Sequence, residues 1–293
     1  MSPSALASLL ALVLAMSSIQ FGASLAKQLF PVLGPVATTM LRTSLAGLML
    51  LAVQRPWRKP ITRKAWLLVL PYGAALGIMN TLFYLALRRI PLGLAVALEF
   101  TGPLGLALIH SHRRSHLLWV ALASFGILSL LPIGDRIDAL DPLGIVLALG
   151  AGLCWALYII FGQKVGRELP SAQASCLGIC IAALVVLPFG LMQPLGALAS
   201  PQLWGKALAL AFLSSALPYS LEMIALKRMS THSFGILMSI EPAIATCMGL
   251  IFLGEHLSPL QFVAIGAIMV ASAGSALSSS PSKKADSYLE AGA

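Results

Sequence analysis

The amino-acid sequence predicts an all-α membrane protein with ten transmembrane helices, arranged as two inverted five-helix repeats. Three observations support this fold class: ten long apolar runs, positive charges that gather in alternate loops, and an internal repeat that relates the two halves of the chain. Each run is close to the roughly 20 residues that an α-helix needs to cross a bilayer. The runs lie near residues 5–26, 34–53, 65–87, 92–110, 116–134, 142–162, 172–192, 207–226, 233–253 and 258–278.

The composition excludes an ordinary soluble protein. Of the 293 residues, 58% are hydrophobic and only 10% are charged, and the mean hydropathy is +0.91. Soluble domains carry about 25% charged residues. The apolar runs are also longer and more uniform than the alternating segments of about 10 residues that build a membrane β-barrel. Because the connections between the runs are short, the chain has no room for a separate soluble domain.

The positive charges predict the orientation of the helices. If the N-terminus is cytoplasmic, 13 Lys and Arg side chains fall in cytoplasmic segments, 5 fall in outer loops, and Arg42 lies within a run. This asymmetry follows the positive-inside rule and predicts that both termini are cytoplasmic. It also accounts for the net charge of +9, so no nucleic-acid partner is expected. The first run has no Lys or Arg before it and is long enough to span, so we interpret it as a helix and not as a signal peptide.

An internal repeat relates the two halves of the chain. At a shift of 139 residues, ALRRIPLGLAVALEFTGP (86–103) aligns without a gap with ALKRMSTHSFGILMSIEP (225–242). The alignment predicts two five-helix repeats, 1–134 and 142–278, followed by a polar cytoplasmic tail, 279–293, that is expected to be disordered. Because five is an odd number, the second repeat enters the membrane with the opposite orientation. Inverted repeats with a site near the midplane are typical of many secondary transporters.

Four ionisable side chains lie well inside the apolar runs: Arg42, Glu99, Glu222 and Glu241. A charge at membrane depth costs roughly 2.5 kcal/mol or more on insertion scales, so such residues usually face a cavity or a pathway. Counted at about 1.5 Å per residue, Arg42 and Glu99 are expected about 12 Å from the outer face, Glu241 near the middle and Glu222 close to the inner boundary. For Glu222, a structural ion pair explains the charge equally well.

Proline residues accompany these charges. Pro103 lies four residues after Glu99 and has no N–H to bond the Glu99 carbonyl, and Pro242 directly follows Glu241. Pro218 lies in the eighth run, close to Glu222. We expect these three prolines to break their helices and to leave backbone carbonyls free. When Pro103 and Pro242 are aligned, the two glutamates differ in register by three residues, so we expect them to have different roles.

Polar and aromatic side chains in the same runs complete a candidate substrate cavity. Such groups form a minority of a ligand pocket and fix the orientation of the ligand. Each of them alone also fits a packing or interfacial role, but they gather in the runs that carry charges, while the fifth, seventh and tenth runs are nearly featureless. The predicted substrate-binding residues are Gln20, Arg42, Asn80, Tyr84, Glu99, Trp155, Tyr158 and Tyr219, and the predicted proton-coupling residues are Glu99, Glu222 and Glu241.

One cation and several carboxylates suit a small zwitterion. Arg42 can bind a substrate carboxylate through two parallel hydrogen bonds, an acidic side chain can face the ammonium group, and amides or hydroxyls can bind a side-chain hydroxyl. Because burial disfavours the charged form of a carboxylate, Glu99 and Glu241 are candidate proton carriers. A substrate and a proton that compete for one carboxylate would produce antiport.

The sequence lacks the motifs of other function classes. It has no Walker loop and no metalloprotease or intramembrane-protease motif, and a membrane enzyme would need a nucleophile–base pair, for which we find little support. His110, His112 and His116 fall in a basic cytoplasmic turn, which we interpret as solvated and not as metal-binding. The four cysteines lie within apolar runs and are interpreted as packing residues. No cofactor or metal is expected.

Several segments resemble a known family. The duplicated ten-helix plan and the Gly-Glu pair that closes the ninth run are similar to the EamA branch of the drug/metabolite transporter superfamily. Within that branch, five segments resemble the bacterial exporters of threonine and homoserine: SSIQFGASLAKQLFP, PLGLAVALEFTGPL, ALPYSLEMIAL, FGILMSIEPAIA and IFLGE. The resemblance covers nearly the whole chain apart from the tail. It implies a basket of two inverted repeats in the bacterial inner membrane, in which the first four helices of each repeat line a central cavity and the fifth lies behind.

We therefore expect a secondary transporter, and not an enzyme, that exports threonine, homoserine and related small neutral amino acids by proton antiport. The direction of transport is implied by the resemblance alone. The alternative is efflux of another small metabolite or a cationic compound by the same fold. The expected partners are amino acids, protons and membrane lipid. Small-residue spacings such as Ala267, Ala271 and Ser275 fit packing within one bundle and contact in a homodimer equally well.

Overall fold

The structure is a computed structural model that describes residues 3–58, 60–109, 116–130, 140–218, 221 and 237–278. All regular secondary structure in these ranges is helical, so the expectation of an all-helical chain is confirmed. The elements are α1 (Pro3–Gln54), η1 (Pro56–Arg58), α2 (Arg63–Leu87), α3 (Leu92–Glu99), α4 (Thr101–Ile109), α5 (His116–Leu130), α6 (Pro142–Gly166), α7 (Ser171–Leu191), η2 (Gly196–Ala199), α8 (Pro201–Ala211), the π-helix η3 (Phe212–Ala216), α11 (Glu241–Leu253) and α12 (Pro259–Ser278).

The expected end of the first helix was wrong, whereas the ninth run breaks close to Pro242, as expected. The first helix does not end near residue 26 but continues to a break at Gly34, beyond which α1 runs on to Gln54. The ninth run is interrupted by a turn at 239–240, and α11 begins at Glu241. Tyr219, Glu222, segment 110–115 and the tail 279–293 lie outside the described residues. The count of ten helices and the inverted repeat stay predictions.

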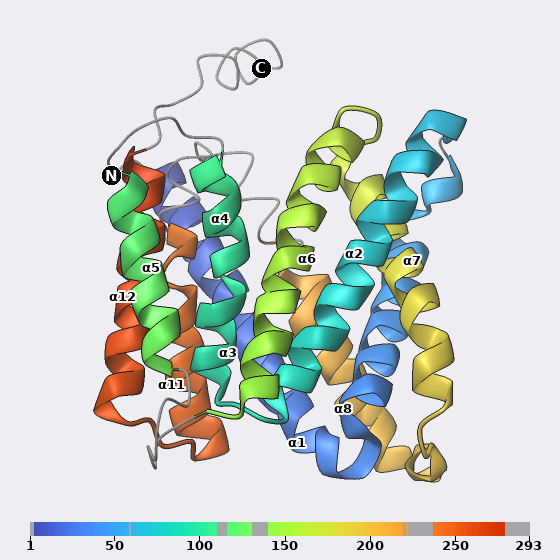
Figure 1. Ribbon diagram of the computed structural model, residues 1–293. Helices are drawn as coiled ribbons and strands as arrows, with labels where there is room; N and C mark the ends of the chain where they lie inside the picture. Colours follow the sequence, from blue (N-terminus) through green and yellow to red (C-terminus); the bar gives the residue numbers. More distant parts are fainter. Residues whose placement is uncertain are drawn as a thin grey trace.

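The helices pack side by side as a bundle (Figure 1). α5 and α12 contact each other on one side of it, and α2, α6 and α7 form the other side. α3 and α4 lie between the two sides, where they contact α6 and α12. We call the end of the bundle that holds the turns 88–91, 192–200 and 254–258 the outer end, because the charge pattern predicts that it faces away from the cytoplasm.

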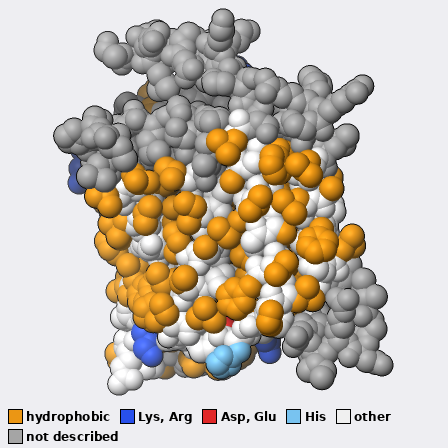
Figure 2. All heavy atoms as spheres, turned by 90° about the vertical axis from the view of Figure 1, so that its left-hand side faces the viewer, with side chains coloured by type: hydrophobic (Ala, Val, Ile, Leu, Met, Phe, Trp, Pro, Cys, Tyr) orange, Lys and Arg blue, Asp and Glu red, His pale blue; other side chains and the backbone are white. Residues whose placement is uncertain are grey.

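The helices are those of a membrane protein. Four described helices are long and apolar enough to cross a bilayer: Leu9–Gln54, Arg63–Leu87, Pro142–Gly166 and Ala172–Leu191. Shorter apolar helices cover Leu92–Leu106, Leu118–Leu130, Glu241–Leu253 and Pro259–Ser275. On the face formed by α5 and α12, exposed hydrophobic side chains cover the middle, and the visible Lys and Arg side chains lie near the ends (Figure 2). Such an apolar belt suits contact with lipid.

The break in α1 has a backbone cause. Gly34 has φ 74° and ψ 161°, a combination that only glycine adopts readily. Pro31 and Pro35 flank it and lack the N–H groups that would continue the helical hydrogen bonds. The two halves of α1 therefore pack against different partners. The first half contacts 237–244, and the second half contacts α7.

Replacing Gly34 by alanine should destabilise the protein through backbone strain. The added methyl group has room, because its nearest neighbour would be Gln193 Oε1 at 3.8 Å. We expect the free energy of unfolding to fall by about 1–3 kcal/mol, measured as a lower thermal midpoint in detergent micelles.

Gly205→Ala is the matched control, because Gly205 lies within α8 and a methyl group there meets no atom within 4 Å. It should be neutral or slightly stabilising. Equal midpoints for the two variants would contradict a strained break at Gly34.

Candidate functional site

A buried cation lies at the centre of the candidate site. Arg42 belongs to the second half of α1 and is 7% exposed. Its Nη2 donates a hydrogen bond to Asn80 Oδ1, and its guanidinium carbon lies 5.0 Å from the centroid of the Tyr84 ring. Asn80 is held in turn, because its Nδ2 donates to the Leu76 carbonyl at 2.7 Å. Asn80 and Tyr84 lie one turn apart on α2, so one face of that helix presents both to the arginine.

A second polar contact joins the first half of α1 to α11. Gln20 Nε2 donates a hydrogen bond to Glu241 Oε1 at 2.8 Å, and both side chains are buried. Glu241 is the first residue of α11, so its carboxylate lies beside the positive end of the helix dipole. Pro242 suits the first turn of a helix, where a missing N–H leaves no bond unmade. The break expected at Pro242 is therefore a helix start in this structure.

Glu99 lies near both of these contacts. It is the last residue of α3 and is buried. Its carboxylate interacts electrostatically with Glu241 and with Arg42, and also with the thiol of Cys154 on α6. The structure thus gathers one cation and two carboxylates in one buried region, whereas counting residues along the helices placed Arg42 and Glu99 at a similar depth and Glu241 nearer the middle.

The helix also breaks beside Glu99. α3 ends at Glu99 and α4 begins at Thr101, because Pro103 has no N–H to bond the Glu99 carbonyl. That carbonyl lies against Gly152 of α6, where a methyl group would come within 2.6 Å of the oxygen. Glycine allows this close approach of two backbones. The break therefore directs Glu99 into the region where α3 and α6 meet.

A π-helix places two further buried residues, Ser214 and Ser215, that sequence reasoning missed. In η3 the N–H of Leu217 bonds to the carbonyl five residues back, and the next residue, Pro218, has no N–H. The wide turn leaves the Leu213 carbonyl without its usual backbone donor, and Ser18 Oγ donates to it at 2.7 Å. Single π-turns are frequent at functional sites. The available signal was the pair of serines just before a proline in an apolar run.

Five buried polar atoms of this region have no hydrogen-bond partner in the part of the chain that the structure describes. They are Gln20 Oε1, Arg42 Nε, Tyr84 Oη, Ser214 Oγ and Glu241 Oε2. Leaving a buried polar atom unpaired costs about 1–3 kcal/mol, and such atoms are therefore uncommon unless water or a ligand completes them. Because this set contains both donors and acceptors, the region is the candidate site for a small polar molecule.

Comparison with known proteins identifies the family. Residues 142–277 match the model of the EamA-like transporter family. The chain is 52% identical over 266 residues to the threonine/homoserine exporter RhtA of Escherichia coli strain K12, in an alignment that covers 91% of this chain and 90% of the relative. The chain belongs to the EamA-like transporter family. It is also 51% identical over 269 residues to the threonine/homoserine exporter RhtA of Salmonella typhimurium strain LT2, covering 92% of this chain and 91% of the relative.

The fold is shared with a protein of known structure. A crystal structure that is 18% identical to this EamA-like chain matches it with a TM-score of 0.61, covering 91% of this chain and 96% of the other. At this identity the likeness shows a shared fold alone. Together with the transporter relatives, the apolar helices make the chain a multi-pass protein of the bacterial inner membrane.

Two predicted residues of this EamA-like transporter, Trp155 and Tyr158, have aromatic partners. The ring of Trp155 makes an edge contact with Phe100, with centroids 5.2 Å apart. Tyr158 stacks on Tyr72 at 4.8 Å, and their hydroxyls lie 3.1 Å apart. The remaining two predicted residues, Tyr219 and Glu222, lie outside the described residues. Within the described chain, no three His, Cys, Asp or Glu side chains gather as metal ligands.

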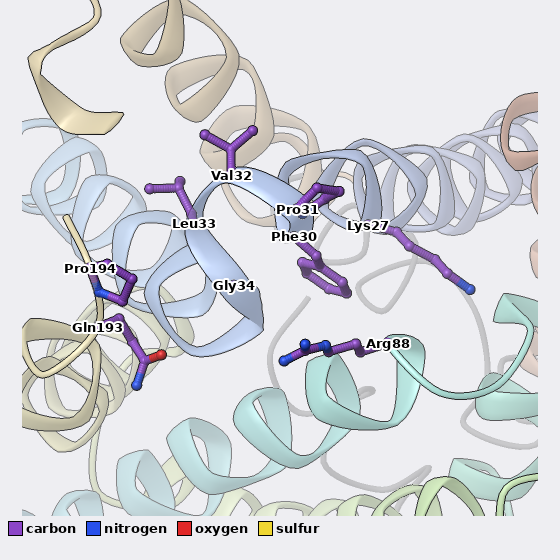
Figure 3. Close-up of a pocket in the computed structure, with 9 residues that line it drawn as sticks. All are labelled: Lys27, Phe30, Pro31, Val32, Leu33, Gly34, Arg88, Gln193 and Pro194. Atoms are coloured by element: carbon purple, nitrogen blue, oxygen red, sulfur yellow. The ribbon is translucent and has the colours of Figure 1, made fainter. Parts of the chain in front are cut away.

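A pocket of about 550 Å³ lies at the outer end of the bundle (Figure 3). It is formed by the break in α1 and by the turns that follow α2 and α7, and its lining residues are Lys27, Phe30, Pro31, Val32, Leu33, Gly34, Arg88, Gln193 and Pro194. The Phe30 ring also contacts the Tyr84 ring, with centroids 5.5 Å apart. Because Tyr84 contacts Arg42, two aromatic rings lie between this pocket and the buried cation.

An ion pair ties the helices together beside this pocket. Lys27 Nζ lies 2.6 Å from Glu255 Oε1 and donates to the Ile90 carbonyl at 3.2 Å. Glu255 Oε2 accepts a hydrogen bond from the Leu92 N–H at 2.9 Å. These bonds join α1, the start of α3 and the segment after α11. Glu255 therefore has a structural role at the outer end.

Glu255→Ala should lower the free energy of unfolding by about 2 kcal/mol or more, because it leaves the partly buried Lys27 and the Leu92 N–H without their partner. The thermal midpoint in detergent measures the loss. Glu168→Ala is the matched control, since it breaks the Lys64–Glu168 pair, which is also 2.6 Å long but has a Lys64 side chain that is 73% exposed. That loss should be about 1 kcal/mol or less. Similar shifts in both variants would contradict the structural role of Glu255.

Proposed function

We propose that this protein exports threonine and homoserine from the cytoplasm in exchange for protons. The observation that carries the proposal is the 52% identity, over 91% of the chain, to a relative named threonine/homoserine exporter. The buried groups around Arg42 support it independently, because they match the charges of an amino-acid zwitterion. Nothing in the residue chemistry sets the direction, so export rests on the relatives.

The substrate carboxylate binds Arg42 in this proposal. The guanidinium is already oriented by Asn80 and Tyr84, and its Nε is free to donate among the described residues. A planar guanidinium binds a carboxylate through two parallel hydrogen bonds. The ammonium group of the substrate then faces Glu241, whose Oε2 has no partner in the described part while Oε1 is held by Gln20.

Proton coupling follows from the two carboxylates. Glu99 and Glu241 interact with each other in a buried region, where two negative charges repel strongly. A proton relieves that repulsion when the site is empty, and the ammonium group of the substrate relieves it when the site is occupied. Substrate and proton therefore exclude each other, and antiport results. We assign the proton to Glu99 and the ammonium contact to Glu241.

We also propose that the chain has ten transmembrane helices in two inverted repeats, 1–134 and 142–278, with both termini cytoplasmic. The contacts support this arrangement, because helices that the repeat would relate touch each other: α5 with α12, α3 with α11, and α1 with α7. In the proposed repeat, α8 corresponds to α2, and α6 corresponds to the first half of α1. A two-fold relation therefore requires that the contact of α2 with α6 be matched by a contact of α8 with α1, and both contacts are present. The partners remain amino acids, protons and lipid, with a homodimer as a further state to test.

The alternative cargo is another small metabolite or a cationic compound. Arg42 argues against a cation as the main substrate, because a buried guanidinium in the same region repels it. An enzyme activity has no support from the site, and the relatives are transporters.

Replacing Glu99 by glutamine should separate proton coupling from substrate movement. The variant keeps the shape of the side chain but cannot exchange a proton. In proteoliposomes, we expect threonine efflux driven by a pH gradient to fall at least tenfold, while exchange of labelled for unlabelled threonine continues. Glu241→Gln should reduce both, because it removes the charge that faces the ammonium group.

Glu168→Gln serves as the control, since Glu168 forms a surface ion pair with Lys64 at 2.6 Å. It should leave both measurements unchanged. If Glu99→Gln and Glu241→Gln both retained proton-driven efflux, the antiport mechanism would be wrong. If the wild-type protein moved neither threonine nor homoserine, the proposed substrate class would be wrong.

Replacing Arg42 by lysine should weaken substrate binding. Lysine keeps the positive charge but cannot form two parallel hydrogen bonds with a carboxylate. We expect the KM for threonine to rise tenfold or more, which corresponds to about 1.4 kcal/mol. Arg167→Lys is the control, because Arg167 caps α6 at an exposed position. An unchanged KM in Arg42→Lys would rule out Arg42 as the carboxylate site.

A further inference from the structure

We infer that Ser214, in the π-helix, binds the side-chain hydroxyl of the substrate and so selects hydroxylated amino acids. This inference rests on the proposed function, because it adds a third contact to the carboxylate and ammonium contacts described above. Threonine carries its hydroxyl on the β-carbon and homoserine on the γ-carbon. Both become 2-aminobutyrate when the hydroxyl is removed, so one analogue tests both substrates.

The position of Ser214 is set by the backbone. η3 widens the helix over Phe212–Ala216, and Ser18 Oγ anchors the widened turn by its bond to the Leu213 carbonyl at 2.7 Å. Ser214 follows directly and lies against Gly22 of α1, where a methyl group would collide with Ser214 Oγ. A glycine at this position is what allows the serine to approach α1 so closely.

The hydroxyl of Ser214 is buried and available. The residue is 5% exposed, and its Oγ has no hydrogen-bond partner among the described residues. It lies close enough to the Tyr84 hydroxyl for the two to interact, but neither oxygen meets the geometry of a hydrogen bond to another described residue. A hydroxyl both donates and accepts, so a substrate hydroxyl placed near these two groups could bond to each of them.

The neighbours of Ser214 place it at the substrate. Tyr84 contacts the guanidinium of Arg42, and Gly22 lies two residues after Gln20, which holds Glu241. Ser214 is therefore connected to Arg42, the proposed carboxylate group, through Tyr84, and it packs on the same helix half, α1, that carries Gln20. The unpaired atoms then divide into three sets: a donor for the carboxylate, acceptors for the ammonium, and two hydroxyls for the hydroxyl of the substrate.

Such a site discriminates against a substrate without a hydroxyl, because that substrate leaves the buried hydroxyls of the protein unpaired. A pocket that is built to bind a hydroxyl rejects an analogue without one, because the buried partner then loses its hydrogen bond. A pocket lined only by apolar atoms does not reject the smaller analogue strongly. The preference for threonine over 2-aminobutyrate therefore reports on Ser214.

The test is Ser214→Ala in proteoliposomes, with efflux of threonine, homoserine and 2-aminobutyrate measured separately. We expect kcat/KM for threonine and homoserine to fall about tenfold or more, which is the range for one lost buried hydrogen bond, and kcat/KM for 2-aminobutyrate to stay within about twofold. Ser129→Ala is the matched control, because the Ser129 hydroxyl is already bonded to the Gly126 carbonyl at 2.8 Å within α5. It should leave all three substrates unchanged.

Gly22→Ala is a second variant that keeps the serine. Its methyl group would occupy the place of Ser214 Oγ and push the hydroxyl aside. The variant should therefore lower kcat/KM for threonine and homoserine and leave kcat/KM for 2-aminobutyrate unchanged. This variant decides the question if Ser214→Ala does not yield folded protein.

The outcomes separate this inference from the proposed function. Wild-type protein that moves neither threonine nor homoserine overturns both. Wild-type protein that prefers threonine to 2-aminobutyrate, with the same preference retained in Ser214→Ala, overturns only the assignment of Ser214. If Ser214→Ala lowers kcat/KM equally for all three substrates, Ser214 supports the structure without binding the hydroxyl. This result also overturns the assignment.

Discussion

The burial of charge inside an apolar bundle is the constraint on which the rest of this structure depends. Arg42, Glu99 and Glu241 are all less than a tenth exposed, in apolar runs that contain few other charges. Charged groups in such surroundings must be paired or hydrogen-bonded. Asn80 and Gln20 each satisfy part of one charge. The atoms that remain unpaired define what the site is able to bind.

The helices are interrupted beside the two buried glutamates. A continuous α-helix has all its backbone groups bonded within itself and leaves no polar backbone for a site. Here Pro103 separates α3 from α4, Pro242 lies in the first turn of α11, and a π-helix precedes Pro218. Each interruption lies beside a residue of the buried cluster. Glycine contributes in another way, because the absence of a side chain at Gly152 lets the Glu99 carbonyl pack closely against α6.

The outer end of the bundle is organised by different means. Gly34 turns the backbone of α1, and the Lys27–Glu255 pair joins α1, α3 and the segment after α11. The pocket there is connected to the buried cation through Phe30 and Tyr84. At this end the partly exposed charges of Lys27 and Glu255 hold helices together, whereas the buried charges of Arg42, Glu99 and Glu241 form the candidate site.

Composition and periodicity were enough to predict an all-helical membrane chain, because long apolar runs with few charges have one stable form in lipid. The rarity of charge in those runs also identified Arg42, Glu99 and Glu241, since its cost in the membrane holds whatever surrounds it. The sequence could not show that Gln20 meets Glu241, 221 residues away, or that Tyr158 stacks on Tyr72. Those contacts depend on how the helices pack.

The proposed role of Ser214 likewise depends on how the helices pack. A serine in an apolar helix usually bonds to its own backbone, and the local sign that Ser214 differs is the serine pair ahead of Pro218. Only the tertiary structure shows that the π-helix brings Ser214 against Gly22 and beside Tyr84. The sequence by itself determined which side chains are costly to bury, because that cost is local. The packing of α1, α2, α3, η3 and α11 decided which of them share a site, because that depends on helix breaks and close approaches between distant segments.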